Sequence, residues 1–388
     1  MPSTYEVGQF STLLFALHSA AQATPQTVRL QSRAAPAHPA QRRRALYPGS
    51  LPLADFFLGT DLQWIGNISV GTPPQVVPVV FDTGSNTLEF ASTLCGEPCS
   101  NQVQFNPTKS STFVDGGVTS NITFFGSGVG VAPVVGDELQ LILRNATETV
   151  SIAGLTVPQT EVFLITNQTS AFAIDPFSGI QGMNPSAGVF GGLVDQGLPS
   201  LFSFFLTPKA VGDAELTVGG IDSAKFRGSL TYASLPPNGS GELWSLDSPQ
   251  VFVNGQTNAL LNTIKNFVFD AGLSAALLPT NTTEAIYALI SPDILPHASE
   301  PGAYGIACDR IPTLAAEISI QFTAQDGTPF NLTIPSTELS VGPFADEPET
   351  CQTLINAFDG LNVVGGSLLK HYYSVWDVGG QRMGFAAV

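Results

Sequence analysis

The apolar positions of this chain fall in short runs separated by turn residues. From Asp61 onward these runs are bounded by Gly, Pro, Asn and Ser, a pattern typical of β-strands. The strands predicted in the first half are Trp64–Val70, Val76–Phe81, Ile122–Phe125, Glu138–Leu143, Val162–Ile165 and Glu215–Val218. Those predicted in the second half are Leu230–Ala233, Gln250–Val253, Asn266–Phe269, Glu317–Phe322, Asn331–Ile334 and Tyr372–Asp377. Only Leu198–Leu206 and Thr282–Ile290 favour short helices, so the pattern predicts a mostly β fold.

Length and composition indicate two packed units. A chain of 388 residues exceeds the size at which a single core stops growing, and its 43% apolar residues suffice for sizeable cores. Charged residues make up only 12%, whereas Gly (38) and Pro (29) are abundant, which favours strands joined by tight turns. We therefore expect two β lobes.

The charge balance excludes two classes of partner. The formal net charge is -17, from 31 acidic and 14 basic residues, so nucleic-acid phosphates and anionic membranes would be repelled. Many of those carboxylates would be protonated in acid, and the few basic residues generate little self-repulsion, so the composition tolerates low pH. An ordinary soluble acidic protein would share this composition.

The first 50 residues differ from the rest. A short apolar stretch, Leu13–Leu17, precedes small residues and resembles a secretory signal, although a basic n-region is missing. We interpret residues 1–23 as a signal peptide. Residues 24–50 are rich in Ala, Pro, Gln and Arg and contain the basic run Arg42–Arg44, which indicates a short basic pro-segment.

Cysteines and sequons also favour export. Four cysteines fall as one pair in each half, which fits disulfides in an oxidising compartment better than a metal site, because no histidine stands at ligand spacing from the first pair. Seven N-x-S/T sequons support secretion and glycosylation. They are Asn67, Asn121, Asn145, Asn167, Asn238, Asn281 and Asn331.

Two segments, Val79–Ser85 and Phe267–Ser274, repeat one pattern. Each consists of an apolar run followed by Asp-x-Gly, with the acids at Asp82 and Asp270. One Asp-x-Gly alone is usually a surface turn, but two after matching apolar runs indicate a duplicated unit. A second repeat, in Gly179–Gly182 and Val363–Gly366, supports the duplication. We expect pseudo-twofold lobes whose aspartates meet at the floor of a cleft.

Two carboxyl groups held that close share one proton and titrate as a pair. The ionised member can deprotonate a water that attacks a peptide carbonyl, and the protonated member can donate to the carbonyl oxygen. This chemistry needs no covalent nucleophile, metal or cofactor, and none is predicted.

From about Asp61 to Val388 the chain resembles the pepsin family of aspartic endopeptidases, as a secreted fungal member. The resemblance depends on Ile68–Gln75, Phe81–Asn86, Leu216–Asp222 and the terminal segments Val364–Gly366, Tyr372–Asp377 and Met383–Phe385, in the family's order. It implies a bilobal fold, an aspartate dyad at Asp82 and Asp270, disulfides Cys95–Cys99 and Cys308–Cys351, and a basic pro-segment that blocks the cleft until low pH releases it. The supporting positions that it implies are Thr83, Gly84, Ser85, Gly272 and Ser274.

The second motif departs from the family. Ala271 stands where the family has Thr or Ser, whose hydroxyl would pair with that of Thr83 to brace the two lobes, so half of that brace is missing. Leu273 replaces a hydroxyl that would donate to the outer oxygen of Asp270. The loss of this donor, together with the added apolar bulk, should raise the apparent pKa of the dyad. Ser85 is expected to support Asp82.

The flap that closes over substrate in this family corresponds to Phe124–Gly128, with Phe125, Gly126 and Ser127 as substrate-binding residues. Phe125 stands where the family has Tyr, and Glu89 where it has the Trp that hydrogen-bonds that Tyr. Because both partners of this hydrogen bond are absent together, the pattern indicates a changed flap. If only one of them had been replaced, the other would lack its hydrogen-bond partner. We expect Glu89 to be a solvated strand residue rather than a third carboxylate in the cleft.

The sequence thus predicts a monomeric, secreted acid endopeptidase that cleaves polypeptides between large apolar residues. Its N-terminal lobe would span residues 51–222 and its C-terminal lobe residues 223–388. A catalytically weak or inactive homologue that binds peptides or inhibitors in the cleft is the alternative, because Ala271, Leu273 and Phe125 each lack a supporting hydroxyl. A secreted structural or carbohydrate-binding β-protein would make the paired motifs a coincidence.

Overall fold

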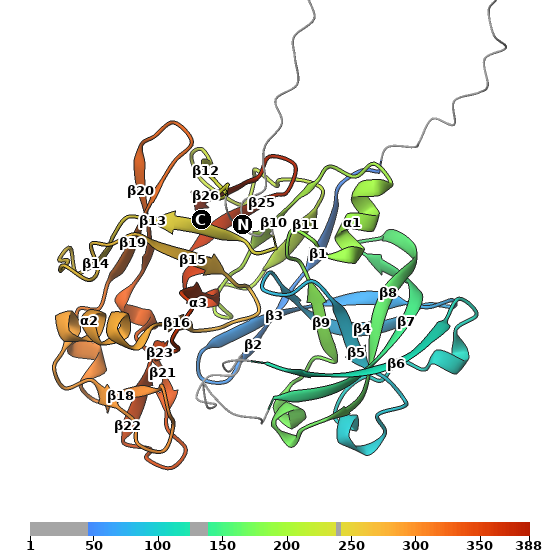
Figure 1. Ribbon diagram of the computed structural model, residues 1–388, viewed down its shortest axis with the longest axis horizontal. Helices are drawn as coiled ribbons and strands as arrows, with labels where there is room; N and C mark the ends of the chain where they lie inside the picture. The colour runs from blue at the N-terminus through green and yellow to red at the C-terminus, as the bar shows by residue number, and fades with distance from the viewer. Residues whose placement is uncertain (1–45, 125–138, 238–241) are drawn as a thin grey trace, which may run out of the picture. The chain divides into compact units, whose positions relative to one another are not determined.

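The computed structural model of the chain describes residues 46–124, 139–237 and 242–388. Within these ranges the strands form five sheets (Figure 1). The largest sheet contains eight strands, coloured blue to green in Figure 1. Its order is β2 (Ala54–Phe57), β3 (Asp61–Val70), β4 (Gln75–Asp82), β9 (Gly179–Gly182), β5 (Leu88–Ala91), β8 (Leu155–Gln168), β7 (Gln140–Ile152) and β6 (Val114–Thr123).

Three smaller sheets use only residues from the second half. A five-stranded sheet is ordered β13 (Ser245–Ser248), β15 (Lys265–Phe269), β24 (Val363–Val364), β16 (Ala276–Leu278) and β23 (Ile355–Ala357). A three-stranded sheet contains β14 (Val251–Val253), β19 (Ile318–Thr323) and β20 (Pro329–Ile334). A four-stranded sheet contains β17 (Leu295–Pro296), β18 (Tyr304–Ala307), β22 (Thr350–Thr353) and β21 (Ser340–Pro343).

A six-stranded sheet joins the two halves of the chain. Its order is β1 (Gly49–Pro52), β11 (Glu215–Val218), β10 (Leu201–Phe205), β25 (Tyr372–Asp377), β26 (Arg382–Ala387) and β12 (Thr231–Ser234). The central pair, β10 and β25, is antiparallel, with Leu201 opposite Asp377. The lobe boundary expected after residue 222 therefore lies within a shared sheet and stays a prediction.

Helices are few and short in the described ranges. The α-helices are α1 (Gly188–Asp195), α2 (Thr280–Ile290) and α3 (Gly366–Leu369). Single 3-10 turns occur at η1 (Glu97–Cys99), η2 (Pro107–Lys109), η3 (Ser170–Ile174), η4 (Ile311–Thr313) and η5 (Ser336–Glu338). Among the described residues the longest helix, α2, has 11 residues, and none of these helices has the length and apolarity that a bilayer requires.

The strand pairing repeats between the halves. The first acidic motif ends β4, which runs parallel to β9; the second follows β15, which runs parallel to β24. In turn β9 is antiparallel to β5 and β24 is antiparallel to β16. Finally β5 is parallel to β8 and β16 is parallel to β23. These matched pairings are the structural form of the repeat seen in the sequence.

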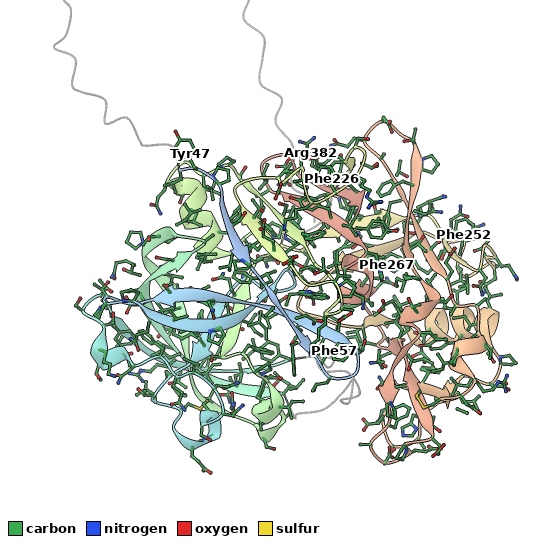
Figure 2. All side chains as sticks on the ribbon, turned by 180° about the vertical axis from the view of Figure 1, so that it is seen from behind. Tyr47, Phe57, Phe226, Phe252, Phe267 and Arg382 are labelled. Atoms are coloured by element: carbon green, nitrogen blue, oxygen red, sulfur yellow. A yellow bond between two sulfur atoms is a disulfide. The ribbon has the colours of Figure 1, made fainter. Side chains whose placement is uncertain are left out.

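The buried core is continuous across the halves. One apolar cluster contains Trp64 and Phe81 from the first half together with Phe267 and Trp376 from the second. Phe267 is fully buried on β15 (Figure 2). The rings of Trp244 and Trp376 lie 5.4 Å apart in an edge-to-face arrangement. The second acidic motif is thus attached to a strand that is anchored in the main core.

Most strand predictions agree with the structure, and one helix prediction is wrong. Glu215–Val218 and Tyr372–Asp377 match β11 and β25, and the predicted helix Thr282–Ile290 corresponds to α2. The segment Leu198–Leu206, predicted as a helix, contains strand β10 instead. Neighbours β11 and β25 flank β10 on both edges, and three of its five residues are buried, so its apolar run lacks the alternation that marks a half-exposed strand.

Candidate active site

Asp82 and Asp270 occupy matching places in the two halves. Asp82 is the last residue of β4, and Asp270 directly follows β15. Backbone hydrogen bonds hold each acid to the neighbouring parallel strand. Met183 N–H, directly after β9, donates to Asp82 O at 2.7 Å, and Asp270 N–H donates to Val364 O on β24 at 3.0 Å. Paired, buried strands therefore fix the backbone beneath both carboxyl groups.

The two carboxyl groups are in contact. Their side chains share a hydrogen bond. The backbone at each motif glycine lies against the opposite acid: an added Cβ at Gly84 would lie 2.5 Å from Asp270 Oδ2, and one at Gly272 would lie 2.6 Å from Asp82 Cγ. Only glycine permits this approach from both sides. The predicted meeting of the two acids is therefore present in the structure.

Each glycine also supports its own aspartate. Gly84 N–H donates to Asp82 Oδ1 at 2.7 Å, and Gly272 N–H donates to Asp270 Oδ1 at 2.8 Å. Burial, followed by the neighbouring charge of Asp82 and the hydrogen bond between the two acids, raises the pKa of Asp270 well above its ordinary value. The pair therefore retains a proton in a range where an isolated carboxyl group would lose it, and it can act as acid and base together.

A single hydroxyl connects the two acidic loops from below. Thr83 Oγ1 donates to Phe269 O at 2.9 Å and accepts a hydrogen bond from Ala271 N–H at 2.8 Å. Both bonds are buried and cross from one half of the chain to the other. Ala271 is 3% exposed and has no hydroxyl with which to form the matching pair. The bracing under the dyad is therefore asymmetric.

Restoring the missing hydroxyl should stabilise the protein. In Ala271→Thr, the pseudo-twofold arrangement places the new hydroxyl within reach of the backbone around Asp82. We expect the free energy of unfolding to rise by about 1 kcal/mol, the net value of a buried hydrogen bond. Urea unfolding at pH 4 measures this, with Ala271→Val as the matched control for added volume. Equal unfolding midpoints for the two variants would contradict the prediction.

Three further residues of the two acidic loops, Leu273, Ser274 and Ser85, differ in their contacts. Leu273 packs with Val268, Leu277 and Val363 in a small apolar cluster beside Asp270. Ser274 is buried, and its carbonyl accepts a hydrogen bond from Ser367 N–H at 3.0 Å. Ser85 Oγ is buried and makes no hydrogen bond within the described part of the chain, so the expected bond from Ser85 to Asp82 is not formed there.

Glu89 is not the solvated residue expected from the sequence. It lies on β5, between β8 and β9, with 0% exposure, and all four residues of this strand are buried, so both faces of β5 are covered. Its Oε2 accepts a hydrogen bond from Thr87 Oγ1 at 2.7 Å, while Oε1 is buried without a partner among the described residues. Burial, and to a smaller degree the charge of Asp82, raises the pKa of Glu89 to about 8. A third carboxyl group therefore lies within electrostatic range of the dyad.

Sequence reasoning missed Gln63, which contacts the second acidic loop. Its side-chain Nε2 donates to Gly272 O at 2.7 Å. Gln63 lies on β3, directly before the predicted strand Trp64–Val70, and no local signal indicates a contact with a residue so distant along the chain. The structure adds Gln63 to the residues around the dyad.

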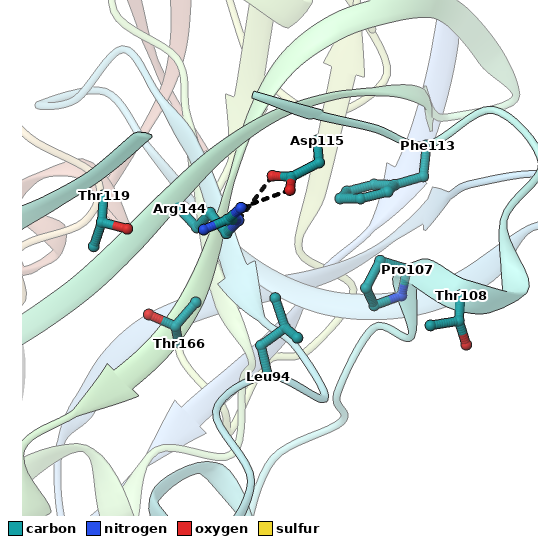
Figure 3. A pocket seen from close by; sticks show the side chains of 8 residues that line it. All are labelled: Leu94, Pro107, Thr108, Phe113, Asp115, Thr119, Arg144 and Thr166. Carbon is teal, nitrogen blue, oxygen red and sulfur yellow. Dashed lines mark hydrogen bonds and ion pairs between the residues drawn. The ribbon is translucent and has the colours of Figure 1, made fainter. Parts of the chain in front are cut away.

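Some predicted features lie outside the described residues. These are the signal peptide, most of the pro-segment, the flap residues Phe125, Gly126 and Ser127, and the sequon at Asn238. A separate hollow of about 510 Å³ lies beside β6 and β7 (Figure 3). Its wall includes Phe113 and the Asp115–Arg144 ion pair, and neither aspartate of the dyad lines it. This hollow is distinct from the candidate active site.

Both expected disulfides are present. Cys95–Cys99 closes the short loop that contains η1, and Cys308–Cys351 ties the end of β18 to β22. The sequon side chains differ in accessibility: Asn145 is partly buried and accepts a hydrogen bond from Val118 N–H at 2.9 Å. The exposed sequons in the described ranges are Asn67, Asn121, Asn167, Asn281 and Asn331.

Comparison with known proteins agrees with this geometry. Residues 63–388 match the family described as eukaryotic aspartyl protease. The chain is 29% identical to pepsin A of Rhinolophus ferrumequinum over 84% of this chain and 82% of the relative. It is 28% identical to rhizopuspepsin-1 of Rhizopus niveus over 85% of this chain and 79% of the relative. It is 31% identical to pepsin A-5 of Mus musculus over 84% of this chain and 81% of the relative. The chain therefore belongs to the eukaryotic aspartyl protease family, which acts on polypeptides by peptide hydrolysis.

Proposed function

We propose that the protein is a secreted endopeptidase that acts at acid pH through Asp82 and Asp270. The observation that carries this proposal is the contact of the two carboxyl groups, each backed by the glycine of the opposite motif. Because burial and the charge of Asp82 raise the pKa of Asp270, the pair holds one proton at the pH where such an enzyme would work.

In the proposed reaction, the ionised carboxylate removes a proton from a water as its oxygen attacks the carbonyl carbon of the peptide bond. The protonated carboxyl group donates its proton to the carbonyl oxygen, which gives a neutral tetrahedral intermediate. When this intermediate collapses, the C–N bond breaks and the leaving nitrogen takes a proton from the protonated carboxyl group of the dyad. The ionised carboxylate of the dyad takes a proton from one hydroxyl of the intermediate, which becomes the new carboxyl product. The dyad ends with the one proton with which it started.

Substrate preference and secretion are further parts of the proposal. Cleavage between large apolar residues, held extended over the dyad, follows from the family resemblance. Secretion is supported by the two disulfides and by the exposed sequons. The expected localisation is extracellular, with residues 1–23 as the signal peptide and residues 24–50 as the pro-segment.

Acid-treated protein assayed on denatured haemoglobin from pH 2.5 to 7 tests the function. We expect proteolysis that a statine-type inhibitor blocks and that Asp82→Asn and Asp270→Asn abolish, because each variant removes the shared acid and base pair. Asp175→Asn, a buried carboxyl group outside the dyad, is the matched control and should retain activity. Inhibitor binding without cleavage at any pH would instead support the peptide-binding homologue.

A further inference from the structure

The second acidic loop has a partner from the other half of the chain. Gln63 is 7% exposed on β3, and its amide donates to Gly272 O at 2.7 Å across 209 residues of sequence. The other amide atom, Oε1, is buried without a partner in the described ranges. This side chain therefore makes its one described hydrogen bond to the loop that contains Asp270.

The peptide unit between Gly272 and Leu273 connects Gln63 to the dyad. Its carbonyl oxygen accepts from Gln63, and its N–H, which belongs to Leu273, donates to the backbone oxygen of Asp270 at 3.3 Å and also favours the ionised form of the Asp270 carboxyl group. On the other side of Gly272, its own N–H donates to Asp270 Oδ1 at 2.8 Å, so the contact with Gln63 holds a residue that bonds the carboxyl group directly. A donor on the carbonyl of a peptide unit polarises that unit and strengthens its N–H as a donor. The same contact fixes the rotation of the unit, and therefore the direction of the N–H.

Strand β3 is itself firmly held near Gln63. Asp61 pairs at 2.8 Å with Lys370 Nζ, which also pairs at 2.7 Å with Glu338, and the Lys370 side chain is 4% exposed. On the other side, Trp64 Nε1 donates to Thr207 O at 2.9 Å. A buried ion pair and a buried indole hydrogen bond thus connect β3 to distant parts of the chain on both sides of Gln63.

We propose that Gln63 is a positioning residue that orients the carboxyl group of Asp270 through the Gly272–Leu273 peptide. This role rests on the proposed function, and it replaces support that the second motif lacks, since neither Ala271 nor Leu273 provides a hydroxyl. The consequence is specific: removing the amide should disturb Asp270 while Asp82, held by its own loop, keeps its backbone contacts.

Gln63→Leu tests the role, because leucine retains much of the volume and removes the donor. Gln168→Leu is the matched control: Gln168 is 8% exposed, and its Nε2 also donates to a backbone carbonyl, that of Pro98, at 2.9 Å. We expect kcat/KM of Gln63→Leu to fall about 10- to 100-fold, as small misplacements of catalytic groups do. The control should stay within about threefold of the wild type, and both should lose similar thermal stability.

Two further readouts separate positioning from general destabilisation. Both limbs of the kcat/KM pH profile should move to higher pH in Gln63→Leu, because the ionised dyad loses support. In Gln63→Glu, the introduced carboxyl group can donate to Gly272 O while it is protonated but not once it has ionised. Activity of this variant relative to the wild type should therefore be nearly full at pH 3 and fall at least about 10-fold by pH 6.

Hydrogen exchange measured by mass spectrometry gives a readout that does not depend on activity. Amides of residues 270–275 should exchange faster in Gln63→Leu than in Gln168→Leu. If the wild type cleaves no substrate, the proposed function fails, and exchange together with inhibitor affinity still decides the role of Gln63. Equal exchange in the two variants, with unchanged pH limbs or unchanged inhibitor affinity, would overturn the inference.

Discussion

Glu89→Gln should raise the free energy of unfolding at pH 7 by roughly 3 kcal/mol. Glu89 is fully buried on β5, and burial raises its pKa from 4.5 to about 8. A glutamine of nearly the same shape keeps the contact with Thr87 but never ionises. At pH 7 ionisation of Glu89 therefore stabilises the unfolded wild-type chain, whereas the variant has no group to ionise at this position. Each unit of pKa difference between the two states is worth about 1.4 kcal/mol.

The sign follows from proton counts. Between pH 4.5 and 8 the folded protein keeps the Glu89 proton while the unfolded chain loses it, so the free energy of unfolding decreases as pH rises through this window. At pH 4 both states are protonated and the two proteins should be about equally stable. Urea unfolding followed by circular dichroism at pH 4, 5.5, 7 and 8 measures the divergence.

Asp175 provides the comparison, because burial raises its pKa to about 7 from 3.8. Asp175→Asn should also gain stability relative to the wild type with rising pH, but its gain should begin at lower pH and level off near pH 7. The gain from Glu89→Gln should continue to about pH 8. Stability curves that run parallel to the wild type over the whole range would mean that Glu89 is solvated in solution.

Glu89 also shows where sequence reasoning reached its limit. Acidic residues are rarely buried, so exposure was the better expectation for one polar position in a short run. Burial here depends on both faces of β5 being covered, which only the assembled fold determines. The contact between Gln63 and Gly272 is similarly invisible in the sequence. By contrast, the two aspartates could be placed correctly, because a repeated strand and turn pattern is a local signal that folding converts into symmetry.

The helix prediction for the segment around β10 was wrong for a related reason. Its run of Leu, Phe and Ser residues fits a buried strand and a buried helix equally well by periodicity. Pairing with β11 and β25 makes the segment a strand, and β25 lies near the C-terminal end of the chain. The conformation of this segment thus depends on partners far away in the sequence, whereas the hydrogen bonds of the correctly predicted helix α2 are local.

Thr83→Val should destabilise the protein by about 3 kcal/mol and lower kcat/KM at least about 100-fold. The substitution keeps the shape but removes the hydroxyl that bonds Phe269 O and Ala271 N–H. Two backbone groups would then be buried without partners, each at a cost of about 1 to 3 kcal/mol. Because those groups flank Asp270, its distance from Asp82 would no longer be fixed, and the shared proton would be held less well. Urea unfolding and initial rates of cleavage at pH 4 measure the two effects.

Thr83→Ser separates the hydroxyl from the methyl group. It should keep most activity and lose only about 1 kcal/mol, since a buried methyl group is removed but both hydrogen bonds remain. The combined variant Thr83→Val and Ala271→Thr moves the hydroxyl to the other half. If the halves are equivalent about their approximate twofold axis, this variant should recover at least about 1 kcal/mol of the loss and part of the rate. Failure of the second hydroxyl to recover either quantity would show that the support under the dyad depends on which half supplies it.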